Sequence, residues 1–233
     1  VTRTGPIDFT VNYSNVQNVT LTPADITLNR LGTADGTVTV SGAKVDGAAV
    51  RTVTVSGITG DGTIGILIAA NTASDTAGFF APAAGPSATF IVDNTPPGIS
   101  IGTPSISVTD TGPVSFVISY LSASSVTLAP GNITVNATGN AAAGNVAVTG
   151  SGASSRTVTL SSITGDGNLR IGIAPGTASD SAGNTAPAAG PSQGVTVIAN
   201  LASLPVYTWP IVVAVLATFI AFAAKRRNRH SRT

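Results

Sequence analysis

The feature that most constrains this 233-residue chain is a sequence that occurs twice. Residues 5–13 align with residues 112–120, and residues 81–87 return unchanged as residues 186–192. The offset between the copies is 107 residues early and 105 late. That period is the size of a domain, whereas the units of solenoid proteins run about 20–50 residues. The repeat therefore predicts two domains of one fold, joined in tandem.

Within each copy, apolar residues alternate with polar ones. Ile7, Phe9, Val11 and Tyr13 would share one face of a strand, which is typical of a strand with one buried side. Their counterparts in the second copy are Val114, Phe116, Ile118 and Tyr120. Before residue 204 no stretch has helical spacing. We expect strands at about 6–13, 18–21, 25–30, 37–41, 51–56, 63–69 and 88–93. Seven short strands in about 100 residues predict an all-β fold with two facing sheets.

A short joint separates the two copies. Residues 93–97 read Asp-Asn-Thr-Pro-Pro, and the two prolines stiffen the chain and end strand pairing. We therefore expect a first domain at residues 1–97, a second at 98–199 and a separate C-terminal segment at 200–233. Such a joint favours an extended rod over a collapsed pair.

The composition argues against several classes of function. The chain has no Cys, all its acidic residues are Asp, and its one His, His230, lies in a basic tail. Disulfides, Cys nucleophiles, Cys-based zinc sites and a Ser-His-Asp triad in the body are excluded. Residues 1–200 carry six basic residues against ten Asp, a net charge of −4, so they lack the basic face that nucleic-acid binding needs. We predict that the chain is not an enzyme.

Two groups of loop residues are candidate sites. Ca²⁺ takes six to eight oxygen ligands, and loops at domain ends could supply them. The candidate calcium ligands are Asp75, Asp93, Asn94, Asp110 and Asp180. The alternative is that these residues shape turns through bonds to their own backbone. No other cofactor is expected.

The second candidate is the aromatic pair Phe79-Phe80, which lies in a predicted loop. A contact surface toward the second domain or toward a partner is one interpretation, since exposed apolar patches usually have a function. The alternative is that one ring caps its own core.

Three short motifs recur in the same order in both copies, and a linker lies between the copies. The motifs are the strand at residues 9–14, the turn Gly60-Asp61-Gly62 and the Asp-x-Ala-Gly-Asn loop at residues 180–184, and the linker spans residues 92–96. Together they resemble the tandem bacterial immunoglobulin-like domains of surface proteins, over residues 5–198. The first copy departs from the pattern with Phe79 where the second has Asn184. The resemblance implies two immunoglobulin-like β-sandwiches on a cell surface.

The C-terminal segment predicts a membrane anchor. Residues 204–224 contain no charge, and as a helix they would span about 31 Å, close to the thickness of a bilayer core. The aromatic belt and the positive-inside rule would place residues 1–200 outside the cell and the tail in the cytoplasm. The alternative is a buried amphipathic helix. The anchor residues are Leu204, Pro205, Tyr207, Trp209, Lys225, Arg226, Arg227 and Arg229.

The same segment resembles C-terminal sorting signals. Residues 204–208 resemble the sortase motif Leu-Pro-x-Thr-Gly, but Thr208 is one place late and Trp209 replaces Gly. The Pro-then-Trp pattern is more similar to exosortase-type signals, which would make a sorting protease a partner. A permanent transmembrane helix contacting membrane lipid is the alternative.

These expectations lead to a stalk in the cell envelope that displays an upstream module. Two other hypotheses stay open. One is an adhesin-type binding module for a protein or glycan ligand, and the other is a pair of accessory domains of a larger secreted enzyme.

Overall fold

The computed structural model describes residues 1–199 apart from positions 43 and 46. The predicted anchor, sorting signal and basic tail lie outside these residues. Among the described residues no helix has the length and apolar character needed to cross a membrane. They form strands, with two single-turn 3-10 helices at Pro23–Asp25 and Pro130–Asn132. The predicted all-β class is confirmed for this part of the chain.

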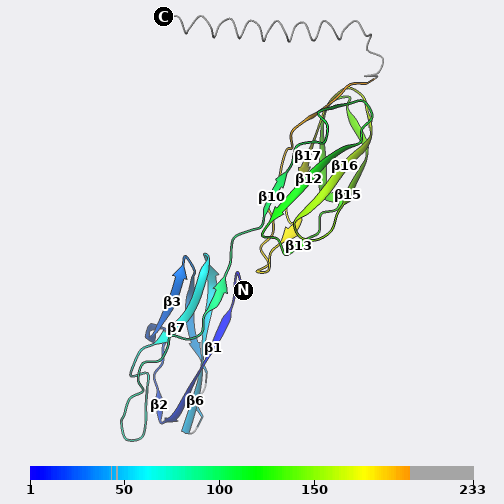
Figure 1. Ribbon diagram of the computed structural model, residues 1–233. Helices are drawn as coiled ribbons and strands as arrows, with labels where there is room; N and C mark the ends of the chain where they lie inside the picture. The colour runs from blue at the N-terminus through cyan, green and yellow to red at the C-terminus, as the bar shows by residue number, and fades with distance from the viewer. Residues whose placement is uncertain (43, 46, 200–233) are drawn as a thin grey trace, which may run out of the picture.

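The first unit contains two facing sheets and a small pair of strands (Figure 1). One sheet has the order β1-β6-β4, with β5 also paired to β6, and the other has the order β3-β7-β9; β2 pairs with β8. The strands are β1 (Ile7–Val16), β2 (Asn18–Val19), β3 (Ile26–Gly32), β4 (Asp35–Ser41), β5 (Lys44–Val45), β6 (Gly47–Thr59), β7 (Gly62–Ile68), β8 (Ala73–Ser74) and β9 (Phe90–Val92). This arrangement fits a β-sandwich.

The second unit repeats this plan with one additional strand on each sheet, β10 on one and β11 on the other. Its sheets have the orders β10-β12-β16-β15 and β11-β19-β17-β14, and β13 pairs with β18. The strands are β10 (Gly98–Ile101), β11 (Val108–Thr109), β12 (Val114–Leu121), β13 (Ser125–Val126), β14 (Ile133–Gly139), β15 (Ala142–Thr149), β16 (Ser155–Thr164), β17 (Gly167–Ile173), β18 (Ala178–Ser179) and β19 (Val195–Val197).

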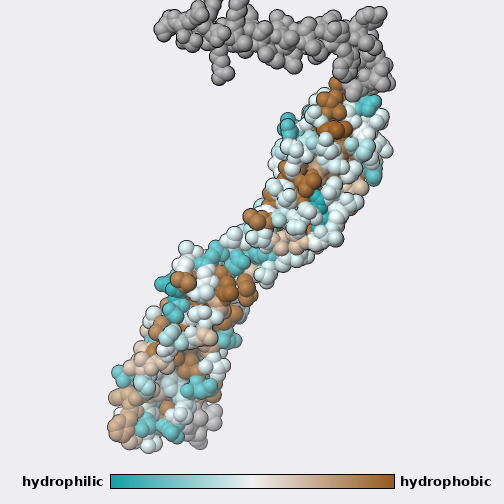
Figure 2. Space-filling model, in the orientation of Figure 1, coloured by the Kyte–Doolittle hydropathy of each residue, from teal (hydrophilic) through white to brown (hydrophobic). Residues whose placement is uncertain are grey.

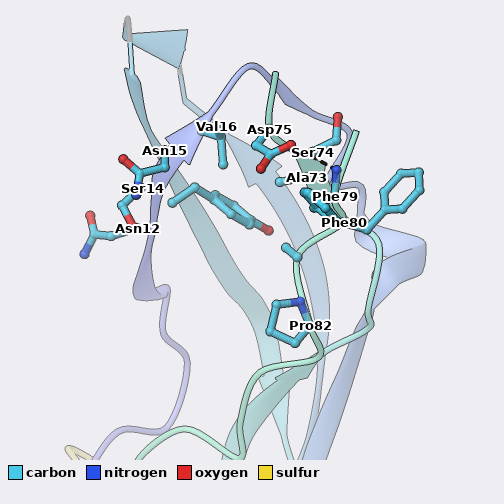
Figure 3. A pocket seen from close by; sticks show the side chains of 12 residues that line it. Asn12, Ser14, Asn15, Val16, Ala73, Ser74, Asp75, Phe79, Phe80 and Pro82 are labelled. Atoms are coloured by element: carbon cyan, nitrogen blue, oxygen red, sulfur yellow. Dashed lines mark hydrogen bonds between the residues drawn. The ribbon is translucent and has the colours of Figure 1, made fainter. Parts of the chain in front are cut away.

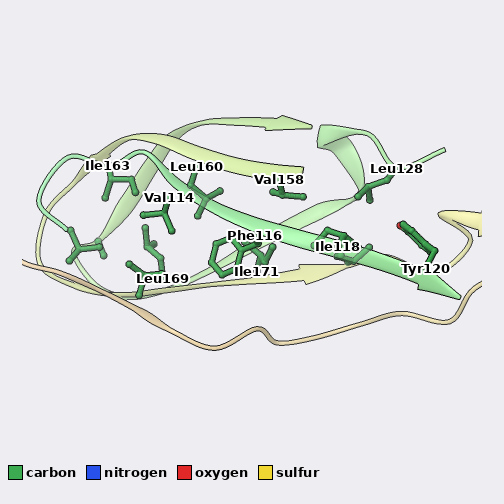
Figure 4. Packing of buried hydrophobic residues seen from close by; sticks show 14 of the residues in the cluster. Val114, Phe116, Ile118, Tyr120, Leu128, Val158, Leu160, Ile163, Leu169 and Ile171 are labelled. Carbon is green, nitrogen blue, oxygen red and sulfur yellow. The ribbon is translucent and has the colours of Figure 1, made fainter. Parts of the chain in front are cut away.

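Each unit has its own hydrophobic core between its two sheets. In the second unit the predicted alternation along β12 is seen in full, since Val114, Phe116 and Ile118 are completely buried and Tyr120 nearly so. Figure 4 shows these side chains pointing into the space between the sheets. Phe116 pairs across the sheet with Val158 of β16, which is also completely buried.

The same alternation on β1 gives a less enclosed core. Ile7, Phe9, Val11 and Tyr13 all turn toward the first core, but each is only half-buried. The difference follows from the neighbours of the two strands. The strand β12 lies between β10 and β16, whereas β1 pairs with β6 and no described strand covers its other edge.

The two units lie end to end, joined by residues 93–97 (Figure 1). In the second unit, the β13–β18 pair lies at the end next to the linker. The counterpart in the first unit, the β2–β8 pair, lies at the end away from the second unit. Equivalent loops are therefore next to the linker in the second unit and at a free end in the first.

The two aromatic positions Phe116 and Phe9 should differ in their contribution to stability. Replacing Phe116 by Ala should destabilise the second unit by about 3–5 kcal/mol, because it empties an enclosed core position. Replacing the equivalent Phe9 by Ala should cost roughly half as much in the first unit, because that ring is already partly solvated. Denaturant unfolding followed separately for each unit measures both. Equal costs would contradict the difference in enclosure.

Candidate contact surfaces at the ends of the two units

The turn between β6 and β7 holds the linker as the chain leaves the first unit. Asp61 accepts hydrogen bonds from the backbone N–H of Asn94 at 2.6 Å and from the hydroxyl of Thr95 at 3.1 Å. The side-chain amide of Asn94 donates to the carbonyl of Gly60 at 2.8 Å. Gly60 has φ +72°, and a Cβ there would lie 2.1 Å from the carbonyl oxygen of Thr33. Only glycine fits this position, so the turn can bring Asp61 to the linker.

The loop at residues 180–184 is organised by one carboxylate. Oδ1 of Asp180 accepts bonds from the backbone N–H groups of Ala182 and Asn184, both at 2.9 Å. Oδ2 accepts a third bond from the side-chain amide of Asn184 at 2.9 Å. Partial desolvation raises the pKa of Asp180, but the bonds from Asn184, Ala182 and Gly183 outweigh it, so the pKa lies below the ordinary value. The carboxylate therefore stays ionised and keeps the loop closed near neutral pH.

This loop also contacts the first unit and the linker. The side-chain amide of Asn184 donates a second bond, to the carbonyl of Asp93, at 2.8 Å. The guanidinium of Arg3 donates to the carbonyl of Gly183 at 3.0 Å. Asn184 is 4% exposed, so its amide is satisfied inside the junction. The sequence analysis did not identify Arg3 or Asn184 as junction residues. For Asn184 the available signal was that the first copy has Phe, not Asn, at the equivalent position 79.

The equivalent loop of the first unit has the same backbone bonds without a cover. Oδ1 of Asp75 accepts from the N–H groups of Ala77 at 2.8 Å and Phe79 at 2.9 Å. Phe79 is 74% exposed and Phe80 is 66% exposed, so neither ring caps the core. Phe80 bridges to Ser74 of β8. The β2–β8 pair lies at the end of the unit away from the second unit (Figure 1), and Figure 2 shows apolar surface at that end. The role of the two rings as a contact surface stays a prediction.

A cavity of about 320 Å³ lies beside this loop. The last residues of β1 form one wall, and the segment from β8 to Pro82 forms the other (Figure 3). Tyr13 also lines the cavity, and its hydroxyl is hydrogen-bonded to the hydroxyl of Thr72 at 2.8 Å. The cavity therefore combines apolar rings with the polar groups of a strand end.

The five candidate calcium ligands are distributed over several hydrogen-bonded loops. Asp75 and Asp180 bind backbone N–H groups, Asp93 accepts from the N–H of Thr95, and Asp110 accepts from the hydroxyl of Thr111. Asn94 contacts Gly60 and Asp61. Among the described residues there is no group of three or more acidic or His side chains that could hold a metal ion. Each of these side chains has a structural partner in a turn or at the junction.

Comparison with known proteins found no match among family models, curated proteins or solved structures.

Asn184 and Phe79 provide a matched pair for testing the junction. Replacing Asn184 by Ala should destabilise the second unit by about 1–3 kcal/mol, because it leaves polar groups of the loop and linker without a partner. Replacing Phe79 by Ala at the equivalent exposed position should change the first unit by less than about 0.5 kcal/mol. Thermal unfolding of the two variants gives both values. A large loss of stability in the Phe79 variant, with none in the Asn184 variant, would contradict the assignment of a covered end in the second unit and an uncovered end in the first.

Proposed function

We propose that this chain is a non-catalytic stalk of the cell surface. In this proposal two immunoglobulin-like sandwiches, residues 1–97 and 98–199, hold an upstream module away from the membrane. The observation that carries it is the end-to-end arrangement of two self-contained cores with a linker bonded on both sides. A linker that is hydrogen-bonded to both units restricts bending, which a spacer requires.

The residues at the junction support the same proposal. Asp61 of the first unit and Asn184 of the second bond to neighbouring linker residues, and Arg3 reaches the loop of the second unit directly. Pro96 and Pro97 stiffen the remainder of the linker. The carboxylate of Asp61 accepts bonds from the linker and that of Asp180 accepts bonds within its own loop, which leaves both poorly placed to act as an acid or a base.

Residues 204–224 complete the proposal as the anchor. They would cross the membrane once, with residues 1–200 outside and the basic tail in the cytoplasm, on the sequence argument above. The tagging experiment described next also tests whether a sorting protease removes the tail.

An epitope tag fused ahead of Val1, with a second tag after Thr233, tests the stalk on intact cells. We expect antibody to reach the first tag, and added protease to remove residues 1–199 while the second tag stays protected. Deleting residues 98–199 should reduce antibody access because the reach is shorter. An unrelated pair of rigid domains of equal length should restore it. Failure of that replacement would show that the units do more than span a distance, and a soluble, uncleaved chain would refute the anchor.

A second candidate function is adhesin-type binding of a protein or glycan. The exposed pair Phe79-Phe80 beside the 320 Å³ cavity favours it. The double variant F79S/F80S should then lose binding of whole cells to a ligand-bearing surface by about tenfold or more, since aromatic anchors dominate such interfaces. The control is Leu31→Ser, which changes another exposed apolar side chain (70% exposed). Equal binding by both variants would exclude this surface as an adhesin site.

Calcium binding at the junction stays a minor hypothesis. The amide nitrogen of Asn184, a donor that cannot bind a cation, lies between the carbonyl of Asp93 and the carboxylate of Asp180. This donor set therefore favours a hydrogen-bonded junction over a calcium-bridged one.

A further inference from the structure

The two copies allow the free end of the first unit to be compared with a covered version of itself. In the second unit, β10 follows directly after the linker and pairs with the end of β12, with Gly98 opposite Leu121 and Ser100 opposite Ser119. The loop at residues 180–184 bonds to the same linker through Asn184. The linker therefore covers one end of the second unit, and β10 covers the outer edge of β12.

Several of the equivalent positions in the first unit are less buried. Tyr120 is 7% exposed and Ala186 1%, whereas their counterparts Tyr13 and Ala81 are half-buried. The position of the buried Asn184 is taken by Phe79, which is 74% exposed. The hydrogen bond of the tyrosine is the same in both units, to Thr177 at 2.9 Å and to Thr72 at 2.8 Å. The two ends thus share their internal structure and differ in what covers them.

The cavity of the first unit lies where that cover would be. Its walls are the end of β1 and the segment from Ala73 to Pro82. These correspond to the end of β12 and to residues 178–187, which in the second unit adjoin the linker and β10. The outer edge of β1 has no strand partner among the described residues.

We propose that the cavity and the outer edge of β1 form a docking site for an extended segment with the chemistry of residues 93–101. Its linker part would fill the cavity beside Phe79 and Phe80. Its strand part would pair with residues 11–14 of β1 in the register that β10 uses on β12. Strand addition of this kind gains affinity from main-chain hydrogen bonds and specificity from alternate side chains. This inference depends on the comparison of the two units and is independent of the stalk proposal.

The side chains favour such a strand as the occupant. Ile99 and Ile101 of β10 pack against the second core, and the half-buried Val11 and Tyr13 mark the corresponding place in the first. An edge strand with unpaired main-chain groups is a template for another strand, which a glycan would not satisfy.

A second copy of this chain, stacked end to end, fits less well. In the junction, Arg3 donates to the carbonyl of Gly183. The residue equivalent to Arg3 in the second unit is Asp110, so a stacked copy would present a carboxylate to the carbonyl of Gly78. A carboxylate cannot donate that bond, and two acceptors would face each other.

The test is a chain with an additional copy of residues 93–107 joined directly ahead of Val1. Because residue 107 precedes Val108, the counterpart of Val1, this extension reproduces the spacing of the second unit. The full chain is compared with and without it in detergent micelles, by residue-resolved amide hydrogen exchange. The backbone amides of Asn12 and Ser14 are the counterparts of those of Ser119 and Leu121. Their exchange rates should be at least about tenfold lower in the extended chain.

The control extension carries Ile99→Asp and Ile101→Asp in the added copy, which removes the apolar side chains and keeps the length. It should leave exchange at Asn12 and Ser14 as in the unextended chain. Unchanged exchange with the native extension would overturn the proposal, and so would equal protection by both extensions. Protection of these amides in the unextended chain, together with a dimer in sedimentation, would assign the edge to a second copy instead.

Discussion

The hydrophobic core between each pair of sheets is the interaction on which the rest of the structure depends. The chain has no Cys, so no disulfide can hold either unit together. Side chains alternate across a strand, and a shift of one residue would turn the entire apolar set outward. Phe116 on β12 and Leu160 on β16 are completely buried, and this burial fixes the register in which the two strands pair. A hydroxyl pair at the strand end, Tyr120 with Thr177, adds a directional bond to an otherwise non-directional core.

The turn that connects the two sheets of a unit also connects the units. The Gly-Asp-Gly turn joins β6 of one sheet to β7 of the facing sheet, and the same Asp61 then bonds to Asn94 and Thr95 of the linker. In the second unit, Asp166 accepts a bond from the N–H of Ala199, the equivalent place after β19. Because the turn needs glycine for its backbone and Asp for its bond, one short motif serves both folding and tandem connection. This double role explains why the Gly-Asp-Gly motif occurs in both units better than a role in the turn alone does.

The sequence predicted the longer strands and the core-facing side of β1 and β12, because period-two alternation reports burial directly. It did not predict the two-residue strands β5, β8, β11 and β18. It also did not predict β10, whose four residues are too few to show a period and which depends on pairing with β12. It also missed Arg3 and Asn184, because a bond between parts of the chain 91 or 180 residues apart leaves no local pattern. The calcium candidates were chosen for residue type and loop position, and such residues shape turns as readily as they bind ions.

Two sequences that share the same motifs reach different burial in the two units, so burial here is set by neighbours as well as by residue type. A side chain at the position of Asn184 must satisfy its amide once the linker covers it, and it does so through Asp180 and Asp93. At position 79 a Phe in a covered junction of the same shape could not form those bonds. Its ring would instead offer apolar surface to whatever lies against it. The replacement would therefore change how this end makes a contact, from a polar bond to apolar packing, while Asp75 forms the same backbone bonds within the loop.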